Sequence, residues 1–241
     1  MMYTRYAAAS GLTPNKRVLE LGCGAGQGFG MLSGSARLLV GGDYSRALLN
    51  SARGHYGARI PLVCLSADAL PFKPASFDVV LCFEASYYVA DMERAFDDIA
   101  RVLAPKGSVL FVNANPERAD FIESPHSVHY HSASEFRTAL SRRGFSVVVT
   151  GAFPTEAASD KIGARVTGGL FSLARRALQV LGLVPTTLRG RARLKRIVYR
   201  TLTKVPAELW PGFSEAAQLT PLGPGPQSGH KVLYVHGLRR E

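Results

Sequence analysis

The sequence predicts an α/β fold whose central sheet is mostly parallel and covered by helices on both faces. Short apolar runs rich in β-branched residues alternate with helical segments between residues 17 and 150. These runs are continuously apolar, which is typical of strands buried on both sides. The first run ends in closely spaced glycines, which allow a sharp turn and a close approach of backbone to a ligand.

Taken in order, the chain predicts seven strands and three helices in this part of the fold. The segment 91–103 shows the clearest helical spacing of apolar residues, and Pro105 with Gly107 interrupts the pattern. Another helix is expected to end at Gly144. Strands are expected at 17–21, 37–42, 60–65, 77–83, 108–113, 145–150 and 231–235, and helices at 45–55, 91–103 and 134–144.

About eighty residues separate the last two predicted strands. Structureless loops of that length are uncommon inside compact domains, so helices are expected within them. Apolar residues recur at steps of three or four in 162–184 and again in 194–202. The sequence therefore predicts a core over 1–150, a helical basic insert over 151–228, and a last core strand with a tail over 229–241. Because the N-terminus leaves little room for lid helices, the insert is expected to supply the lid.

The positive charge of the chain is concentrated in this insert. The 241 residues carry a formal net charge of +11, of which residues 160–204 contribute +10 and residues 1–159 only +1. A basic chain suggests a polyanionic partner, but here the charge belongs to one segment. The charge therefore concerns the insert and its partner, not the protein as a whole.

Cysteine content and hydropathy indicate a reduced, cytoplasmic chain. The N-terminus lacks the apolar core of a secretory leader. The most apolar late stretch, 166–184, is interrupted by two arginines, which disfavours a spanning helix. Three cysteines, widely spaced in apolar runs, match neither a disulfide framework nor a zinc pattern: Cys23, Cys64 and Cys82. Peripheral contact with the inner face of a membrane stays open.

The most informative motif follows the first strand and has the form Glu20-x-Gly22-x-Gly24-x-Gly26. It is not a dinucleotide fingerprint, because the third glycine of that pattern would fall on Gln27. Three further blocks follow in order, at Asp43, at 66–72 and over 76–108. Together the four blocks resemble the class I S-adenosylmethionine-dependent methyltransferases, of the small-molecule type. The resemblance implies a Rossmann-like, seven-stranded sheet with a helical insert before the last strand.

The resemblance also implies which residues contact S-adenosylmethionine. Glu20 would reach the methionine end, Asp43 the ribose hydroxyls, and Asp68 the exocyclic amine of adenine. Two of them have a structural alternative: Glu20 as an ion-pair partner and Asp43 as a cap for the following helix. The expected cofactor contacts are Glu20, Gly22, Cys23, Gly24, Gly26, Asp43, Tyr44, Asp68, Ala69 and Phe83.

Two segments contain candidates for the group that removes a proton from the methyl acceptor. Segment 82–88 follows the fourth strand, where the family lines its reaction centre, and contains Glu84. Segment 124–131 holds three of the six histidines, among them His129 and His131. Histidine and carboxylate side chains suit general-base catalysis, although 124–131 also fits a polar loop before a helix. No carboxylate cluster accompanies these histidines, so no metal site is expected.

The resemblance implies methyl transfer from S-adenosylmethionine to a hydroxyl or amine of a small-molecule biosynthetic intermediate. A sugar, an anionic acceptor and a lipid-linked acceptor all stay open. The alternative is an RNA-directed methyltransferase or a non-catalytic S-adenosylmethionine-binding module using segment 160–204. The absence of the Asp/Asn-Pro-Pro-Tyr and Pro-Cys elements disfavours nucleic acid. The basic segment would bind the acceptor or an anionic membrane, or simply be a solvated lid face. The oligomeric state is not fixed by the sequence.

Overall fold

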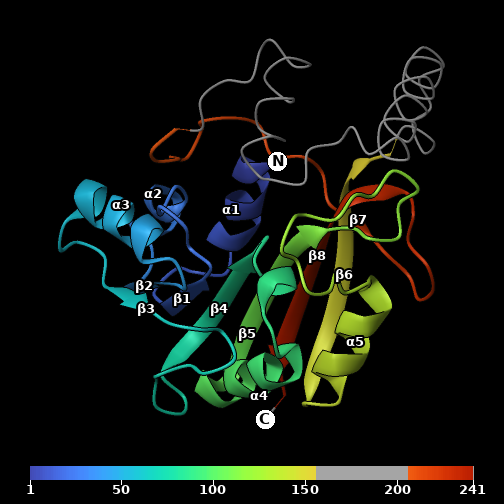
Figure 1. Cartoon of the computed structure of the whole chain (residues 1–241), viewed down its shortest axis with the longest axis horizontal. Coiled ribbons are helices and arrows are strands. Elements are labelled where there is room, and N and C mark those ends of the chain that lie inside the picture. The colour runs from blue at the N-terminus through green and yellow to red at the C-terminus, as the bar shows by residue number, and fades with distance from the viewer. Residues whose placement is uncertain (156–205, 241) are drawn as a thin grey trace.

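The computed structural model describes residues 1–155 and 206–240. At its centre lies one sheet with the strand order β3-β2-β1-β4-β5-β8-β6-β7 (Figure 1). The strands are β1 (Arg17–Leu21), β2 (Leu38–Asp43), β3 (Leu62–Cys64), β4 (Phe77–Phe83), β5 (Leu103–Ala114), β6 (Phe145–Pro154), β7 (Thr220–Pro221) and β8 (His230–Arg239). The helices are α1 (Met2–Ser10), α2 (Phe29–Leu32), α3 (Arg46–Tyr56), α4 (Met92–Val102) and α5 (Ala133–Ser141), with a 3-10 turn, η1, at Ser86–Tyr88.

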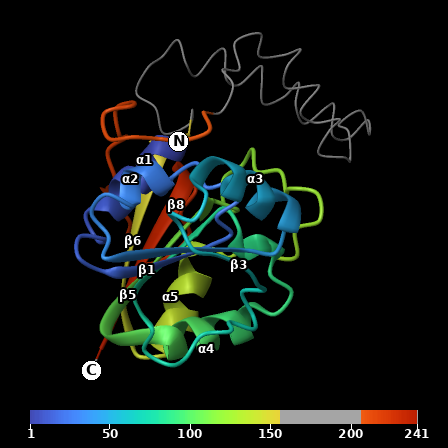
Figure 2. The same cartoon turned by 90° about the vertical axis from the view of Figure 1, so that its left-hand side faces the viewer.

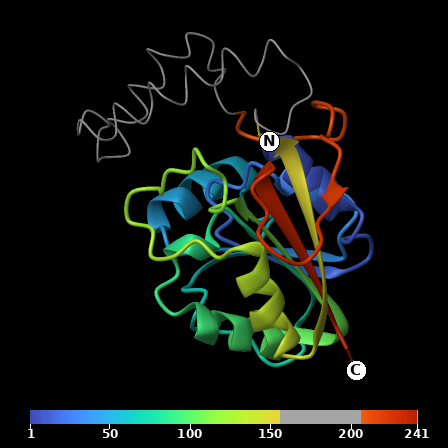
Figure 3. The same ribbon diagram turned by 90° about the vertical axis from the view of Figure 1, so that its right-hand side faces the viewer.

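All seven predicted strands are present, and the described part of the chain adds an eighth. Neighbouring strands from β3 to β5 pair in parallel, whereas β8 lies antiparallel between β5 and β6. Figure 3 shows β6 and β8 side by side. The eighth strand, β7, is only two residues long and pairs with the outer side of β6. The expected mostly parallel, Rossmann-like α/β fold is therefore confirmed, with eight strands instead of seven.

Helices cover both faces of the sheet (Figure 2). One apolar layer joins α4 and α5 to the sheet through fully buried rings such as Phe96 and Phe136. The other joins α1, α2 and α3 through residues such as Tyr6, Phe29 and Tyr56. The long α4 begins at Asp91, whose side chain accepts a hydrogen bond from the Arg94 amide, as a helix cap does. Two helices, α1 and α2, were not predicted from the sequence.

The connection between β6 and β8 is only partly described. The helices predicted over 162–184 and 194–202 lie outside the described residues, so the proposed insert and its boundaries stay predictions. Residues 206–228 are mostly irregular apart from β7. Among the residues that the structure describes, no helix is long and apolar enough to cross a bilayer.

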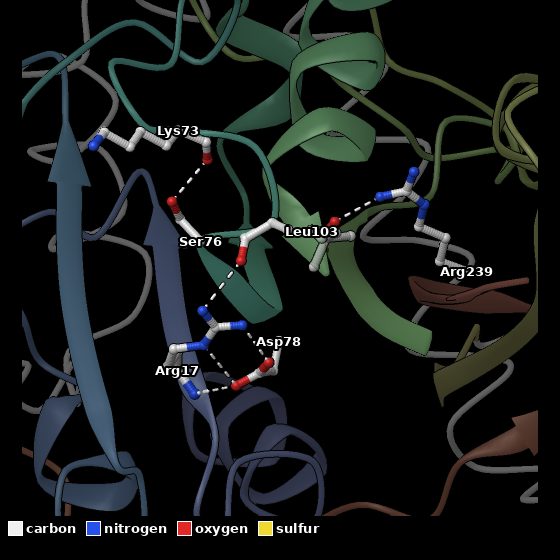
Figure 4. Close-up of polar contacts among 7 residues, drawn as sticks. Arg17, Lys73, Ser76, Asp78, Leu103 and Arg239 are labelled. Carbon is white, nitrogen blue, oxygen red and sulfur yellow. Dashed lines mark hydrogen bonds and ion pairs between the residues drawn. The ribbon is translucent and has the colours of Figure 1, made fainter. Parts of the chain in front are cut away.

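At the amino ends of the parallel strands, Asp78 ties β4 to β1 (Figure 4). Its carboxylate accepts hydrogen bonds from the Arg17 backbone amide at 2.8 Å and from the guanidinium at 2.8 and 3.1 Å. The Arg17 guanidinium holds the pKa of Asp78 below its usual value. This arrangement gives Asp78 a structural role, although it falls within one of the family's sequence blocks.

Candidate active site

The strand order places a crevice at one point of the sheet. From β1 the chain moves to β2 on one side, and β4 lies on the other. In open parallel sheets, ligands bind beside the carboxyl ends of the strands where the order reverses in this way. The residues that follow β1, β2 and β4 therefore form the candidate site.

The loop after β1 carries the glycines at alternate positions, and the structure shows why they are needed. Gly22, Gly24 and Gly26 have φ values of +72°, +59° and +78°, which L side chains rarely adopt. A Cβ on Gly22 would lie 2.3 Å from the Cβ of Ala85, so the loop sits directly against the end of β4. A Cβ on Gly24 would meet only the end of Gln27, at 3.7 Å, so the face of the loop at Gly24 is open.

Asp43, the last residue of β2, fixes this loop. Its Oδ2 accepts a hydrogen bond from the Gly24 amide at 2.8 Å, and its Oδ1 accepts one from the Ser45 amide at 2.8 Å. The cap of α3 is Ser45, whose side chain accepts from the Leu48 amide. Asp43 thus holds both the glycine loop and the start of α3, and each of its oxygens keeps a lone pair for a further donor.

Glu20 lies on β1 beneath the glycine loop and is fully buried. The Tyr6 hydroxyl donates to its Oε1 at 2.7 Å, whereas its Oε2 has no hydrogen-bond partner within the described residues. Burial, reinforced by the nearby charge of Asp43, raises the pKa of Glu20 to about 8. A buried carboxyl oxygen without a partner is costly and suits a cationic ligand group, whose charge would favour ionisation of Glu20.

Three other expected cofactor contacts lie around this loop in different environments. Cys23 is buried, and burial raises the pKa of its thiol. The Phe83 ring packs in the core against the Tyr6 ring, with the two ring centroids 5.2 Å apart. The Tyr44 side chain is 82% exposed, so it covers little of the sheet edge beside it. Contacts of these residues with a cofactor stay predictions.

Contacts with α4 hold in place the loop expected to bind adenine, residues 66–72. The Leu70 amide donates to Asp98 at 2.6 Å, and the Arg101 guanidinium donates to the carbonyl oxygens of Leu70 and Phe72. At the top of the loop, the Ser66 hydroxyl donates to Asp68 Oδ1 at 2.5 Å. Ala69 is exposed and bridges back to Ser66. The loop is therefore held in one conformation beside β3.

The N-terminal helix α1 lies over the site, although we predicted that the N-terminus leaves little room for lid helices. Arg5 forms a 2.9 Å ion pair with Glu84 after β4, and the Tyr6 hydroxyl donates a hydrogen bond to Glu20 on β1. Helix α1 has no side-chain cap and a weak apolar stripe, which explains why its sequence gave little signal. Arg5 and Tyr6 were not predicted from the sequence as site residues. They connect α1 to Glu84 and Glu20.

Close packing of α1 on the glycine loop depends on Gly28. A Cβ there would lie 1.8 Å from the Tyr6 ring, although the backbone at Gly28 has a φ of −92° that alanine adopts without strain. We expect Gly28→Ala to lower the free energy of unfolding by about 1–3 kcal/mol through overpacking, measured by urea denaturation.

The matched control is Gly34→Ala, since a Cβ on Gly34 would meet nothing within 4 Å. Gly28→Ala should cost less in a Tyr6→Ala background than in the parent, because the two substitutions act on one contact. Equal stability of Gly28→Ala and Gly34→Ala would contradict the packing of α1 on this loop.

Glu84 is the proton acceptor candidate next to the glycine loop. It directly precedes Ala85, and its φ of +51° is unusual for a residue with a side chain. The Glu84 amide donates to the Val112 carbonyl oxygen at 2.7 Å, which holds this conformation. Its carboxylate is oriented by Arg5 at 2.9 Å and by the Tyr87 hydroxyl at 3.1 Å.

The two candidate histidines lie on the α4 and α5 side of the sheet. His131 packs edge-on against Phe96, with ring centroids 5.8 Å apart, and also against Phe136. Burial lowers its pKa, so it is neutral at pH 7. His129 forms a 2.9 Å pair with Glu135, which also caps α5 together with Ser132. Both histidines therefore have packing or capping contacts of their own.

The described residues contain no group of histidine, cysteine, aspartate and glutamate side chains arranged to hold a metal ion. An open glycine loop, a buried carboxyl with a free oxygen, and a second carboxylate at the end of β2 suit a ligand with a cationic amine and neighbouring hydroxyls.

Comparison with known proteins indicates a methyltransferase domain. Residues 19–111 match the model of a methyltransferase domain family. A crystal structure of the YcgJ protein from Bacillus subtilis superposes with a TM-score of 0.63 at 18% identity, covering 100% of both chains, which is a likeness of fold.

Curated relatives are also methyltransferases by name. A probable S-adenosylmethionine-dependent methyltransferase of Mycolicibacterium smegmatis is 31% identical over 54% of this chain and 52% of its own. Phthiotriol/phenolphthiotriol dimycocerosates methyltransferase 1 of Mycobacterium ulcerans is 36% identical over 52% and 49%. A fatty-acid O-methyltransferase of M. smegmatis is 36% identical over 45% and 41%. The chain thus spans about half the length of these relatives.

The fold and these matches define the class: residues 19–111 match a methyltransferase domain family, and the chain is similar to S-adenosylmethionine-dependent methyltransferases of class I fold. S-adenosylmethionine is the cofactor of that family. The resemblance deduced from the four sequence blocks is therefore confirmed, while the cofactor and acceptor contacts of individual residues stay predictions.

Proposed function

We propose that the chain transfers a methyl group from S-adenosylmethionine to an oxygen or nitrogen atom of a lipid-like small molecule. The observation that carries the proposal is the pair of carboxyl groups on either side of the glycine loop, Glu20 and Asp43. Bound there, the cofactor supplies an electrophilic methyl group on a sulfonium.

Different residues would bind the three parts of the cofactor: the methionine end, the ribose and the adenine. Glu20, with its unpartnered Oε2, would accept a hydrogen bond from the amine of the methionine end. Asp43 would accept from the ribose hydroxyls, and the loop at Asp68 and Ala69 would flank the adenine. The glycine loop keeps side chains away from the cofactor, and α1 excludes water over Glu20 through Tyr6.

The acceptor class is suggested by the relatives. The relatives that match this chain include proteins named for a dimycocerosate lipid and for a fatty acid. Their likeness covers about half of this chain, so it supports a lipid-like acceptor without fixing the atom that is methylated. Of these two relatives, only the fatty-acid O-methyltransferase has a name that specifies methylation of oxygen.

Glu84 is the residue that we propose as the proton acceptor for a hydroxyl substrate. It lies next to the glycine loop and retains lone pairs beyond those used by Arg5 and Tyr87. In that role it would take the proton of the hydroxyl as the carbon–oxygen bond forms and the carbon–sulfur bond breaks. A carboxylate acceptor is already ionised and needs no such help.

Methyl incorporation from labelled S-adenosylmethionine tests this assignment with three acceptors: a long-chain alcohol, a fatty acid and an alkyl amine. Glu84→Gln should lower turnover of the alcohol about 100-fold or more and leave cofactor affinity unchanged. His129→Ala, the matched control, should stay within about twofold, because His129 is occupied by Glu135. Equal effects of the two substitutions would remove Glu84 from this role.

The basic segment 160–204 bears on the acceptor as well. We propose that its net charge of +10 favours an anionic acceptor or an anionic membrane surface, since each basic residue near such a surface contributes about 1 kcal/mol. RNA retention at low salt would favour the RNA-directed alternative instead. Cofactor binding without methyl transfer to any acceptor would favour a non-catalytic binding module.

A further inference from the structure

A tight turn just after the basic segment presents two aromatic rings to solvent. Residues Trp210, Pro211, Gly212 and Phe213 form the turn, closed by a 3.1 Å hydrogen bond from the Phe213 amide to the Trp210 carbonyl oxygen. Proline at the second position and glycine at the third, with a φ of +86°, are typical of a type II turn. The two rings meet edge to face at 4.8 Å.

The turn is firmly held to the rest of the protein. Leu209, immediately before it, is buried, and its amide donates to the Gln27 carbonyl oxygen at 2.6 Å in the glycine loop. Glu208 pairs with His55 of α3 at 2.8 Å. On the other side, the Gly212 amide donates to the Tyr3 hydroxyl of α1 at 3.0 Å. The rings are therefore presented by a fixed support.

Despite this support, the rings are not packed into the core. The Trp210 side chain is 54% exposed and Phe213 is 40% exposed. The turn lies beside the N-terminal end of α1 and far from the C-terminus (Figure 1). The aromatic turn therefore contacts α1, the helix that also contacts Glu84 and Glu20 of the candidate site.

We propose that the aromatic turn, Trp210 to Phe213, is a membrane-docking surface that inserts its two rings into the interface of an anionic phospholipid bilayer. Tryptophan partitions into the headgroup region because its ring combines an apolar body with a polar N–H, and the Phe213 ring adds apolar area. Charge complementarity favours anionic lipid, because the residues from 160 to 204 that directly precede this part of the chain carry +10.

Trp210 provides its own reporter, because the chain has a single tryptophan. With the unmodified full-length protein, phosphatidylglycerol vesicles should shift the tryptophan emission to shorter wavelength. Vesicles with brominated acyl chains should quench that emission. Neutral phosphatidylcholine vesicles should do both more weakly. Partition that is equal for the two lipids would overturn the anionic preference.

Vesicle flotation of variants tests whether the turn itself carries the binding. Trp210→Ser with Phe213→Ser should reduce partition onto anionic vesicles by about tenfold or more. The matched control is Val148→Ser with Leu238→Ser, two apolar side chains that are 58% and 47% exposed on β6 and β8. This control should partition as the parent does, and both variants should keep the parent's affinity for S-adenosylmethionine.

Two results would overturn the proposal. If the parent floats with vesicles while its tryptophan emission stays unchanged, another surface binds the membrane. If the emission shifts with protein concentration in the absence of lipid, a second copy of the chain covers the turn. Neither result would bear on methyl transfer, which is measured separately with soluble acceptors.

Discussion

Replacing Asp43 with alanine is expected to abolish measurable binding of S-adenosylmethionine. The substitution removes the acceptor of two backbone hydrogen bonds, from Gly24 and Ser45, and the proposed partner of the ribose hydroxyls. Hydrogen bonds to a charged group contribute about 1.5–3 kcal/mol each, so we expect affinity to fall at least 100-fold. Isothermal titration of the protein with S-adenosylmethionine measures the change.

Two variants separate the loss of a ligand contact from a loss of folding. Asp43→Asn keeps the size of the side chain and one oxygen acceptor, so its affinity should lie between those of the parent and Asp43→Ala. Asp78→Asn weakens the ion pair with Arg17 at the amino ends of the strands, away from the candidate site. It should reduce stability and leave cofactor affinity unchanged. An Asp43→Ala protein that binds like the parent would contradict the site.

The second large effect concerns Glu20 and pH. Its pKa of about 8 lies above the usual value for a glutamate, so the folded protein holds an extra proton between about pH 4.5 and 8. The free energy of unfolding should therefore fall as the pH rises through this window, by at most about 1.4 kcal/mol per pH unit. Glu20→Gln should remove this slope, as urea denaturation from pH 5 to 9 would show.

Cofactor binding should be coupled to the same proton. A cationic amine beside Glu20 favours the ionised carboxylate, so binding to the parent near pH 6.5 should release about one proton. Titrations in buffers of different ionisation enthalpy measure that release. Glu20→Gln should release none and bind about 10- to 100-fold more weakly. Proton release that is equal in both proteins would place the cofactor amine elsewhere.

Much of the fold could be predicted because the parallel strands carry an unambiguous pattern. Segment 77–83 is apolar except for Asp78, and such a nearly continuous apolar run is typical of a strand buried on both faces. The two-residue β7 contains Pro221 and has no such pattern. Helix α1 is stabilised by contacts distant in sequence, such as Tyr6 with Glu20, which local periodicity does not reveal.

The candidate site was only partly predictable for the same reason. The glycine spacing pointed to the loop, since Gly22, Gly24 and Gly26 all need positive φ. Nothing in the order of residues showed that Arg5 would meet Glu84, 79 positions away. His131 lies in a polar stretch, yet its ring packs between Phe96 and Phe136. Which polar residue turns inward is decided by the packing of α4 and α5.

The account depends most on the position of the cofactor between Glu20 and Asp43. A crystal structure with S-adenosylhomocysteine bound measures this directly. We expect its amine at Glu20 Oε2, its ribose hydroxyls at Asp43 and its adenine beside Asp68 and Ala69, with α1 closed over the methionine end. A ligand bound away from the glycine loop, or with its ribose turned from Asp43, would contradict the account.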